Sequence, residues 1–343
     1  MNLPWWIALF SLVALAAAFF WPRYGLRSVW REAQAHRARV QREDTLKHIY
    51  TLRAAGQSPT VQSVAGALQI DLGKAAAIIE DLEKHGLLSS TNGALALTDI
   101  GQEYALQIVR AHRLWERYLA DRTGYDRKDW HREAERQEHR LTPEAMEALA
   151  AQLGNPRYDP HGDPIPTETG ELRPLEGQSL ASLEPRQTGR IVHLEDEPAQ
   201  VYEQLMDAGL HVGMQVRVTD KDAQSIRFQA EGRPHSLTHF QAGSVEVQPL
   251  EAVPAAGPPP VTLAQIPLGG AARIVRLSAA CQGAERRRLL DLGFIPGTQV
   301  KVVMRSPGGD DLRAYEVRGT QIALRREQAE MLLVDGGRLT ADG

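Results

Sequence analysis

The sequence predicts a multidomain protein with three kinds of structure. We expect a transmembrane helix, then an all-α region made of a winged helix-turn-helix and a helical dimerisation domain, then two small β-barrels. Three observations support this order: residues 3–21 are apolar and uncharged, residues 44–153 show helical periodicity, and the second half repeats itself. A chain of 343 residues has room for about two to four compact units.

Composition excludes several classes of protein. The net charge of -4 excludes a chain that is strongly basic as a whole, as many nucleic-acid binders are. The single cysteine, Cys281, excludes an intramolecular disulfide and fits a reducing compartment. The sequence has no glycine-rich phosphate loop, nucleophile elbow or HExxH motif, so we expect no enzymatic activity.

The apolar run at residues 3–21 predicts a single membrane span, because at about 1.5 Å per residue it matches a hydrocarbon core of roughly 30 Å. Tryptophans lie near both ends, and basic residues follow the run but do not precede it. This asymmetry predicts a single-pass protein of the inner (cytoplasmic) membrane whose later domains face the cytoplasm. A cleaved signal peptide is the alternative, but it would need a basic segment before the run and a small-residue cleavage site after it. A buried core helix would need polar residues on one face.

Residues 22–43 predict a charged juxtamembrane helix, with six arginines against two glutamates. We expect these arginines to be attracted to anionic lipid headgroups. A DNA-binding arm is the alternative interpretation.

Residues 44–100 have the element order of a winged helix-turn-helix. Thr60 is placed to cap a helix over residues 61–68, and a turn at residues 69–71 leads into a second helix. Asn92-Gly93 then predicts a two-residue hairpin between short β-prone segments.

The helical domain, residues 101–166, contains residues of the types that bind metal. Within the segment WHREAERQEHRL they lie at positions i, i+4, i+7 and i+8, which share one face of a helix. These residues are His131, Glu135, Glu138 and His139. Upstream, His112 and Glu116 lie at i and i+4 on another helix. Imidazole and carboxylate groups together suit Mn, Fe, Co, Ni or Zn.

A solvated helix is the alternative interpretation of the same segment. Arg132, Arg136 and Arg140 are spaced so that they can pair with the glutamates on an exposed surface. Spacing alone leaves both interpretations open.

The second half contains a repeated module at residues 175–250 and 261–335, separated by a proline-rich linker at residues 251–260. LMDAGLHVGMQVRV in the first copy corresponds to LLDLGFIPGTQVKV in the second. Alternating strands, one helix and a glycine turn in each copy predict a small β-barrel.

Residues 44–166 resemble the diphtheria-toxin-repressor family of metal-dependent regulators, in particular its manganese-responsive branch. The motifs that carry the resemblance are DTLKHIY, AHRLWERYL, HREAERQEHRL and DPHGDPIP, in that order. The resemblance implies a homodimer that binds DNA and holds Mn²⁺ or Fe²⁺. It also implies primary ligands, which are Asp44, His112, Glu135, Glu138 and His139, and an ancillary set, which is His112, Glu116 and His131. The repeated module resembles the FeoA domain of ferrous-iron transport, which implies docking or partner binding.

Two positions depart from the family. Lys47 stands where manganese-type members have a glutamate, and an ammonium there would replace a cation, so we expect one metal ion at the primary site. The expected recognition helix offers only Lys74 in its first turns, followed by three alanines. Weak DNA binding is therefore expected from these residues, because phosphate neutralisation dominates DNA affinity.

The residues and the resemblance together predict a membrane-anchored, Mn²⁺- or Fe²⁺-dependent transcriptional regulator in which metal binding favours a DNA-competent dimer. The alternative is a membrane-tethered metal sensor or accessory protein of ferrous-iron transport, with a ferrous-iron permease as its partner and little DNA binding.

Overall fold

A computed structural model describes residues 26–250 and 261–335, apart from residues 92, 232, 279, 307 and 308. The chain forms two compact units. The first contains residues up to 111 together with 138–140 and 166–170, and the second contains residues 112–137, 141–165 and the chain from 171 onward.

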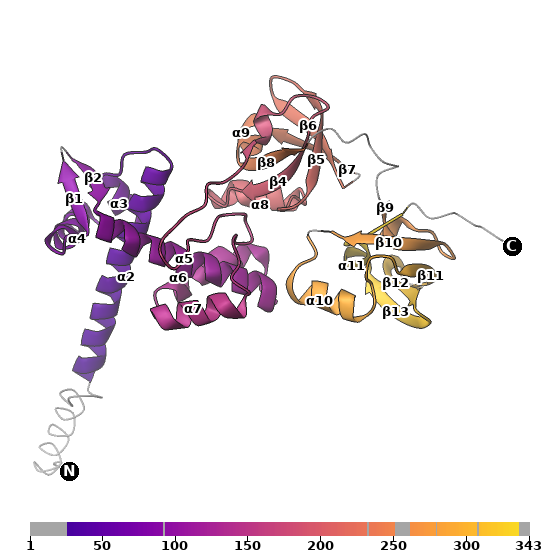
Figure 1. Ribbon diagram of the computed structural model, residues 1–343, viewed down its shortest axis with the longest axis horizontal. Coiled ribbons are helices and arrows are strands. Elements are labelled where there is room, and N and C mark those ends of the chain that lie inside the picture. The colour runs from indigo at the N-terminus through magenta and orange to yellow at the C-terminus, as the bar shows by residue number, and fades with distance from the viewer. Residues whose placement is uncertain are drawn as a thin grey trace, which may run out of the picture. The chain divides into compact units, whose positions relative to one another are not determined.

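The first unit contains the helix-turn-helix and hairpin that the sequence predicts (Figure 1). Its elements are α2 (Leu26–Ala54), α3 (Val61–Ala67), α4 (Leu72–Lys84), β1 (Leu88–Thr91), β2 (Ala94–Leu97) and the start of α5 (Asp99–Arg122). Thr60 and Ser63 form a capping box at the start of α3, and Asp71 caps α4 through the backbone N–H of Lys74. The hairpin pairs Leu88 with Leu97 and Thr91 with Ala94.

The core of this unit is formed where the apolar faces of its helices and hairpin meet. Fully buried members include Leu46 of α2, Val64 of α3 and Ala75 of α4. Ala75 is therefore not available to contact a DNA base, and the exposed start of α4 carries Lys74, Ala76 and Ala77.

Helix α2 is longer than the sequence predicted for the first helix of the winged domain. It runs without interruption from Leu26 to Ala54, so the predicted boundary between residues 43 and 44 lies inside one helix. The charged segment expected beside a membrane is thus part of the helix that builds the first core.

No helix in the described part of the chain is long and apolar enough to cross a membrane. Helix α2 has sufficient length, but charged residues occur throughout it. The predicted location at the inner membrane is corrected accordingly, because no described helix supports it. The predicted span, residues 3–21, lies outside the described residues.

The second unit continues from the later part of α5 into α6 (Trp130–Glu138), α7 (Pro143–Gln152) and two six-stranded sheets. Pro143 occupies the first turn of α7, and the Thr142 hydroxyl accepts the backbone N–H of Ala145.

The two sheets have the same strand order. The first sheet contains β3 (Gln178–Ser179), β4 (Thr188–Leu194), β5 (Gln215–Lys221), β6 (Ser225–Ala230), β7 (Arg233–Thr238) and β8 (Val245–Leu250), with α8 (Ala199–Asp207) and α9 (His239–Gly243). The second contains β9 (Val261–Thr262), β10 (Ala271–Leu277), β11 (Gln299–Ser306), β12 (Gly309–Val317), β13 (Thr320–Arg325) and β14 (Leu332–Val334), with α10 (Gly283–Asp291) and α11 (Arg326–Glu330). Their orders, β3-β8-β4-β5-β6-β7 and β9-β14-β10-β11-β12-β13, match strand for strand.

The repeated glycines of the two copies adopt the same backbone conformation. Gly213 and Gly297 have φ values of 90° and 88°, which an L side chain rarely adopts. Each donates its backbone N–H at 2.8 Å, to the carbonyl of Ile191 or of Ile274. The duplication predicted from the sequence is therefore a duplication of fold.

The prediction of closed β-barrels is wrong, because both sheets are open. The strands at the ends of each sheet, β3 and β7 in the first and β9 and β13 in the second, do not pair with one another. Strands β3 and β9 have two residues each, too few to form the ladder that would close a barrel.

Candidate metal centre

The structure divides the predicted ligands between two groups, each inside one unit. Asp44, Glu138 and His139 come together in the first unit, and we call them the Asp44 cluster. His112, Glu116 and His131 come together in the second unit, and we call them the His112 cluster. In each cluster the ligand atoms lie within 4.8 Å of one another.

The Asp44 cluster is built around the imidazole of His139. Its Nε2 lies 3.0 Å from Asp44 Oδ1 and 3.5 Å from Glu138 Oε1. Its Nδ1 lies 2.6 Å from Glu43 Oε2, and the Tyr104 hydroxyl donates to the other oxygen of Glu43 at 2.7 Å. A carboxylate on the second imidazole nitrogen fixes the ring and makes it a better metal ligand. Glu43, which the sequence did not single out, therefore holds His139 in place.

Lys47 occupies part of the Asp44 cluster. Its Nζ lies 2.9 Å and 3.1 Å from the two carboxylate oxygens of Glu138, whose side chain is 1% exposed. The ammonium thus places one positive charge against the Glu138 carboxylate.

The imidazole of His139 also holds a proton that competes with metal. Burial disfavours the charged ring, but hydrogen bonds with Asp44 and Glu43 and the charge of Glu138 raise its pKa to about 9. Because this folded-state pKa exceeds the ordinary value of 6.5, the protonated ring stabilises the fold below pH 6.5, and this contribution is lost as the pH rises through 9.

We therefore expect the affinity of the Asp44 cluster for Mn²⁺ to increase about tenfold per pH unit between pH 6.5 and 9, because each ion displaces one proton. Mn²⁺ titrations at several pH values check this in a Glu116→Gln chain, where the carboxylate at the centre of the other cluster is removed. The same chain with His139→Gln should bind weakly at every pH. A pH-independent affinity in the presence of His139 would contradict the prediction.

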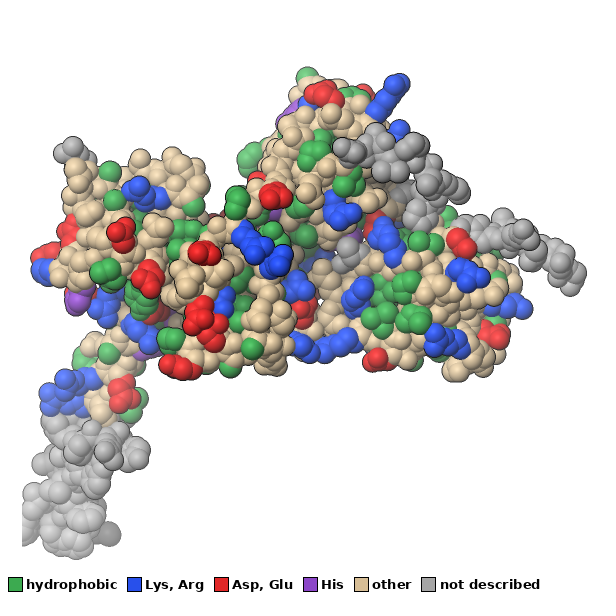
Figure 2. All heavy atoms as spheres, viewed as in Figure 1, with side chains coloured by type: hydrophobic (Ala, Val, Ile, Leu, Met, Phe, Trp, Pro, Cys, Tyr) green, Lys and Arg blue, Asp and Glu red, His purple; other side chains and the backbone are tan. Residues whose placement is uncertain are grey.

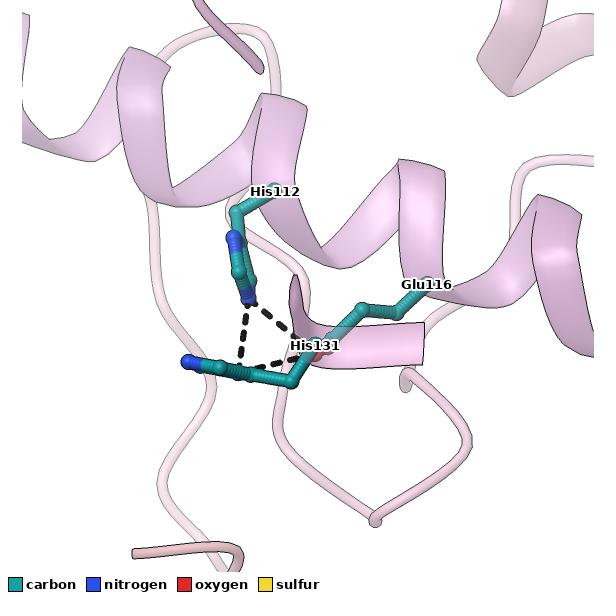
Figure 3. Close-up of side chains that lie close together, drawn as sticks. All are labelled: His112, Glu116 and His131. Carbon is teal, nitrogen blue, oxygen red and sulfur yellow. Dashed lines mark hydrogen bonds and ion pairs between the residues drawn. The ribbon is translucent and has the colours of Figure 1, made fainter. Parts of the chain in front are cut away.

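The His112 cluster brings two imidazoles and one carboxylate to a single point (Figure 3). His112 Nε2 lies 3.0 Å from Glu116 Oε1 and 3.2 Å from His131 Nδ1, and His131 Nδ1 lies 3.2 Å from the same Glu116 oxygen. Ligand atoms about 2.1 Å from a divalent ion are roughly 3 Å apart, so the spacing suits one ion. The i, i+4 spacing on α5 brings His112 and Glu116 together, and α6 supplies His131.

Glu135 belongs to neither cluster in the described structure. Its carboxylate lies 3.5 Å from His131 Nε2, which is the nitrogen on the other side of the ring from Glu116, and its side chain is 54% exposed. Helix α6 ends at Glu138, so the one-face spacing expected for residues 131–139 does not extend to His139.

A carboxylate that the sequence analysis missed lies beside the His112 cluster. Asp196 follows β4 in the first sheet, and its Oδ2 is 3.2 Å from His131 Nδ1. The sequence feature that could have indicated Asp196 is the acidic stretch Glu195-Asp196-Glu197, because the second copy has Ser278-Ala279-Ala280 at the same place.

The loop at residues 155–166 also contacts this site and packs tightly on β4. Gly162 has φ 99°, and a Cβ there would lie 1.9 Å from the carbonyl oxygen of Val192. The backbone N–H of Leu194 donates to the carbonyl of His161 at 2.9 Å. One oxygen of Asp159 accepts the backbone N–H groups of residues 161, 162 and 163, which fixes the loop. The positions of His161 and Asp196 are therefore set together.

The His112 cluster is strongly charged. Although burial opposes it, the pKa of Glu116 is held well below its ordinary value by the charges of His112 and His161 and by hydrogen bonds with His112 and His131. Burial likewise opposes protonation of His131, but Asp196, Glu116 and Glu135 raise its pKa to about 12. A proton on His131 thus balances part of the buried negative charge, and a divalent ion can take over that role.

Comparisons with known proteins identify the domains that surround these clusters. Residues 98–167 match the metal binding and dimerisation domain of the iron dependent repressors, and residues 178–249 and 261–336 each match the FeoA domain. The resemblances expected from the residues are confirmed for these segments.

Relatives match the chain over different lengths. The diphtheria toxin repressor of Corynebacterium diphtheriae is 28% identical over 218 residues, which cover 60% of this chain and 95% of the repressor. A probable metal transport system membrane protein of Chlamydia trachomatis is 43% identical over 86 residues, which cover 25% of this chain and 19% of that protein. The structure of a manganese-dependent transcriptional repressor in complex with manganese aligns with a TM-score of 0.56 at 29% identity, over 61% of this chain and 100% of that one.

Proposed function

We propose that this chain, which carries the metal binding and dimerisation domain of the iron dependent repressors and two FeoA domains, is a transcriptional regulator controlled by Mn²⁺ or Fe²⁺. Two clusters of imidazole and carboxylate groups, each with two buried residues and one half-buried residue, carry the proposal. The relatives that match over most of their own length are repressors, which supports a regulator and not an enzyme. The domains are then the winged helix at 44–100, the metal-binding and dimerisation domain at 101–166, and the FeoA domains at 175–250 and 261–335.

The donor atoms support hard divalent ions. The proposed ligands are Asp44, Glu138 and His139 in one cluster and His112, Glu116 and His131 in the other, with Glu135 beside His131. Oxygen and imidazole nitrogen suit Mn²⁺ and Fe²⁺, whereas thiolate favours softer metals. Cys281 is buried in the core of the second FeoA domain, and burial raises its pKa to about 11, so it is a packing residue.

The N-terminal half of α2 supplies positive charge that α4 lacks. Arg31 and Arg37 of α2 line a surface groove together with Lys74 of α4. All three side chains are exposed, and Figure 2 shows Lys and Arg side chains on this part of α2. Phosphate contacts dominate DNA affinity, so this groove supports an interface to the DNA backbone beside the start of α4.

We propose that metal binding acts by changing the fraction of the protein that is in the DNA-competent state. The matched domain is a dimerisation domain, and an ion that binds more tightly to the DNA-competent homodimer increases the fraction of that state. The metal and the DNA then promote each other's binding by the same factor.

DNA selection with the full chain tests this function. A random duplex library is expected to yield an enriched sequence in the presence of Mn²⁺ or Fe²⁺ and none with chelator. Replacing Arg37 or Lys74 with alanine should each remove about one phosphate contact, which makes the slope of log affinity against log salt concentration shallower by about one.

Lys84→Ala is the matched control, because Lys84 lies at the far end of α4 and pairs with Glu80 at 2.6 Å. If enrichment is the same with metal and with chelator, the chain is not a metal-dependent regulator. If the arginine and lysine variants leave the salt dependence unchanged, the groove is not the DNA interface.

A further inference from the structure

One buried imidazole lies next to the His112 cluster without being part of it. The His161 side chain is 2% exposed, and its Nδ1 has no hydrogen-bond partner. The ring is held edge-on to Tyr202, with centroids 5.0 Å apart, and lies 6.2 Å from the Trp130 ring. A buried ring nitrogen without a partner costs free energy unless something binds it.

The open nitrogen of His161 is directed at carboxylates. Nδ1 lies 3.6 Å from Glu116 Oε2 and 3.8 Å from Asp196 Oδ2, distances too long for hydrogen bonds but suitable for two ligands of one ion. Asp159, also buried, has a ligand atom within 4.8 Å of those of Glu116 and His161. Glu116 thus faces His112 and His131 with one oxygen and His161 with the other.

We infer that Glu116, Asp159 and His161 form a second divalent-cation position, so that the His112 cluster holds a pair of ions bridged by the carboxylate of Glu116. Asp196 lies between the two positions, 3.2 Å from His131 Nδ1 and 3.8 Å from His161 Nδ1. Carboxylate-bridged ions in such pairs are about 3.5–4 Å apart. The inference rests on the proposed function, because the second position uses Glu116, which is also a proposed ligand of the first ion.

The local charge supports a second ion. Four carboxylates meet here, those of Glu116, Asp159, Asp163 and Asp196. Arg113 lies 3.0 Å from Asp163 and 3.9 Å from Asp159, while Glu116 and Asp196 face imidazoles. Among the described ion pairs Asp159 faces one cation, Arg113 at 3.9 Å, so an ion between Asp159, Glu116 and His161 would bring positive charge to this buried carboxylate.

Metal counting tests the pair. The full chain is freed of metal with chelator and equilibrated with Mn²⁺ alone. We expect His161→Gln to bind one ion fewer per chain than the parent, and Asp159→Asn to do the same. The Asn side chain keeps the oxygen that accepts three backbone N–H groups, so the loop should stay folded in this variant. A loss of bound Mn²⁺ in this variant is then not caused by misfolding of the loop.

His211→Gln is the matched control. His211 is also buried, and its Nε2 also has no hydrogen-bond partner, but the carboxylate nearest to that nitrogen is Glu231, at 4.0 Å. We expect this variant to bind as many ions as the parent. Electron paramagnetic resonance gives a second measurement, because two bridged Mn²⁺ ions couple. The coupled signal should disappear in His161→Gln and leave the signal of isolated Mn²⁺.

The possible results are distinguishable. If His161→Gln and Asp159→Asn bind as many ions as the parent while His131→Gln loses one, the second position does not exist and the proposed function is unaffected. If the parent binds no Mn²⁺, both fail. If the parent shows the coupled pair but selects no DNA, the pair stands and the regulator does not.

Discussion

Replacing Glu116 with glutamine is expected to remove most of the protection that Mn²⁺ gives to residues 112–137. The Glu116 side chain is 2% exposed and faces three imidazoles, so the amide fits the space but cannot neutralise a divalent ion. With Mn²⁺ at about 100 times its dissociation constant, binding should stabilise the site by about 2.7 kcal/mol. Amide hydrogens that exchange only when the site opens should then exchange about 100-fold more slowly. Glu116→Gln should abolish this slowing.

Hydrogen exchange with Mn²⁺ and with chelator measures the difference locally, which avoids treating two units as one unfolding transition. Glu133→Gln is the matched control, because Glu133 is on α6 and pairs with Arg136 and Gln137 outside the cluster. If Glu116→Gln shows the same Mn²⁺-dependent slowing as the parent, Glu116 is not a ligand.

Replacing Lys47 with methionine is expected to have opposite effects without and with metal. Without metal, buried Glu138 loses the ammonium 2.9 Å away, and breaking such a pair costs about 3 kcal/mol. With metal, both Glu138 oxygens become available and a neighbouring positive charge is gone. Mn²⁺ affinity at the Asp44 cluster should therefore increase at least about tenfold.

Chemical denaturation of the metal-free chain and Mn²⁺ titration measure the two effects separately. Lys84→Met is the control, because its exposed pair with Glu80 contributes little. If Lys47→Met loses stability without gaining Mn²⁺ affinity, Lys47 is a structural residue and does not compete with metal.

Local patterns in the sequence predicted the elements that depend on local interactions. Thr60 caps α3 as its position indicates, and the repeat corresponds to two sheets of the same order. The i, i+4 pair of His112 and Glu116 meets as expected because both residues lie inside one helix.

The predictions that failed required information beyond a local pattern. The expected helix face over residues 131–139 assumed a helix longer than α6, which ends at Glu138, so His139 lies beyond it. Alternation along a strand shows which face is buried but does not show whether a sheet closes. Asp196 and His161 reach the His112 cluster only through the packing of a loop on β4, which no spacing in the sequence encodes.

The two FeoA domains share a fold but are not equivalent. After β4 the first domain places Asp196 against His131, whereas the corresponding position of the second domain is an alanine, Ala279. At this position only the first copy therefore supplies a carboxylate to the His112 cluster. Exchanging the order of the two copies along the chain would therefore place an alanine where Asp196 now contacts His131.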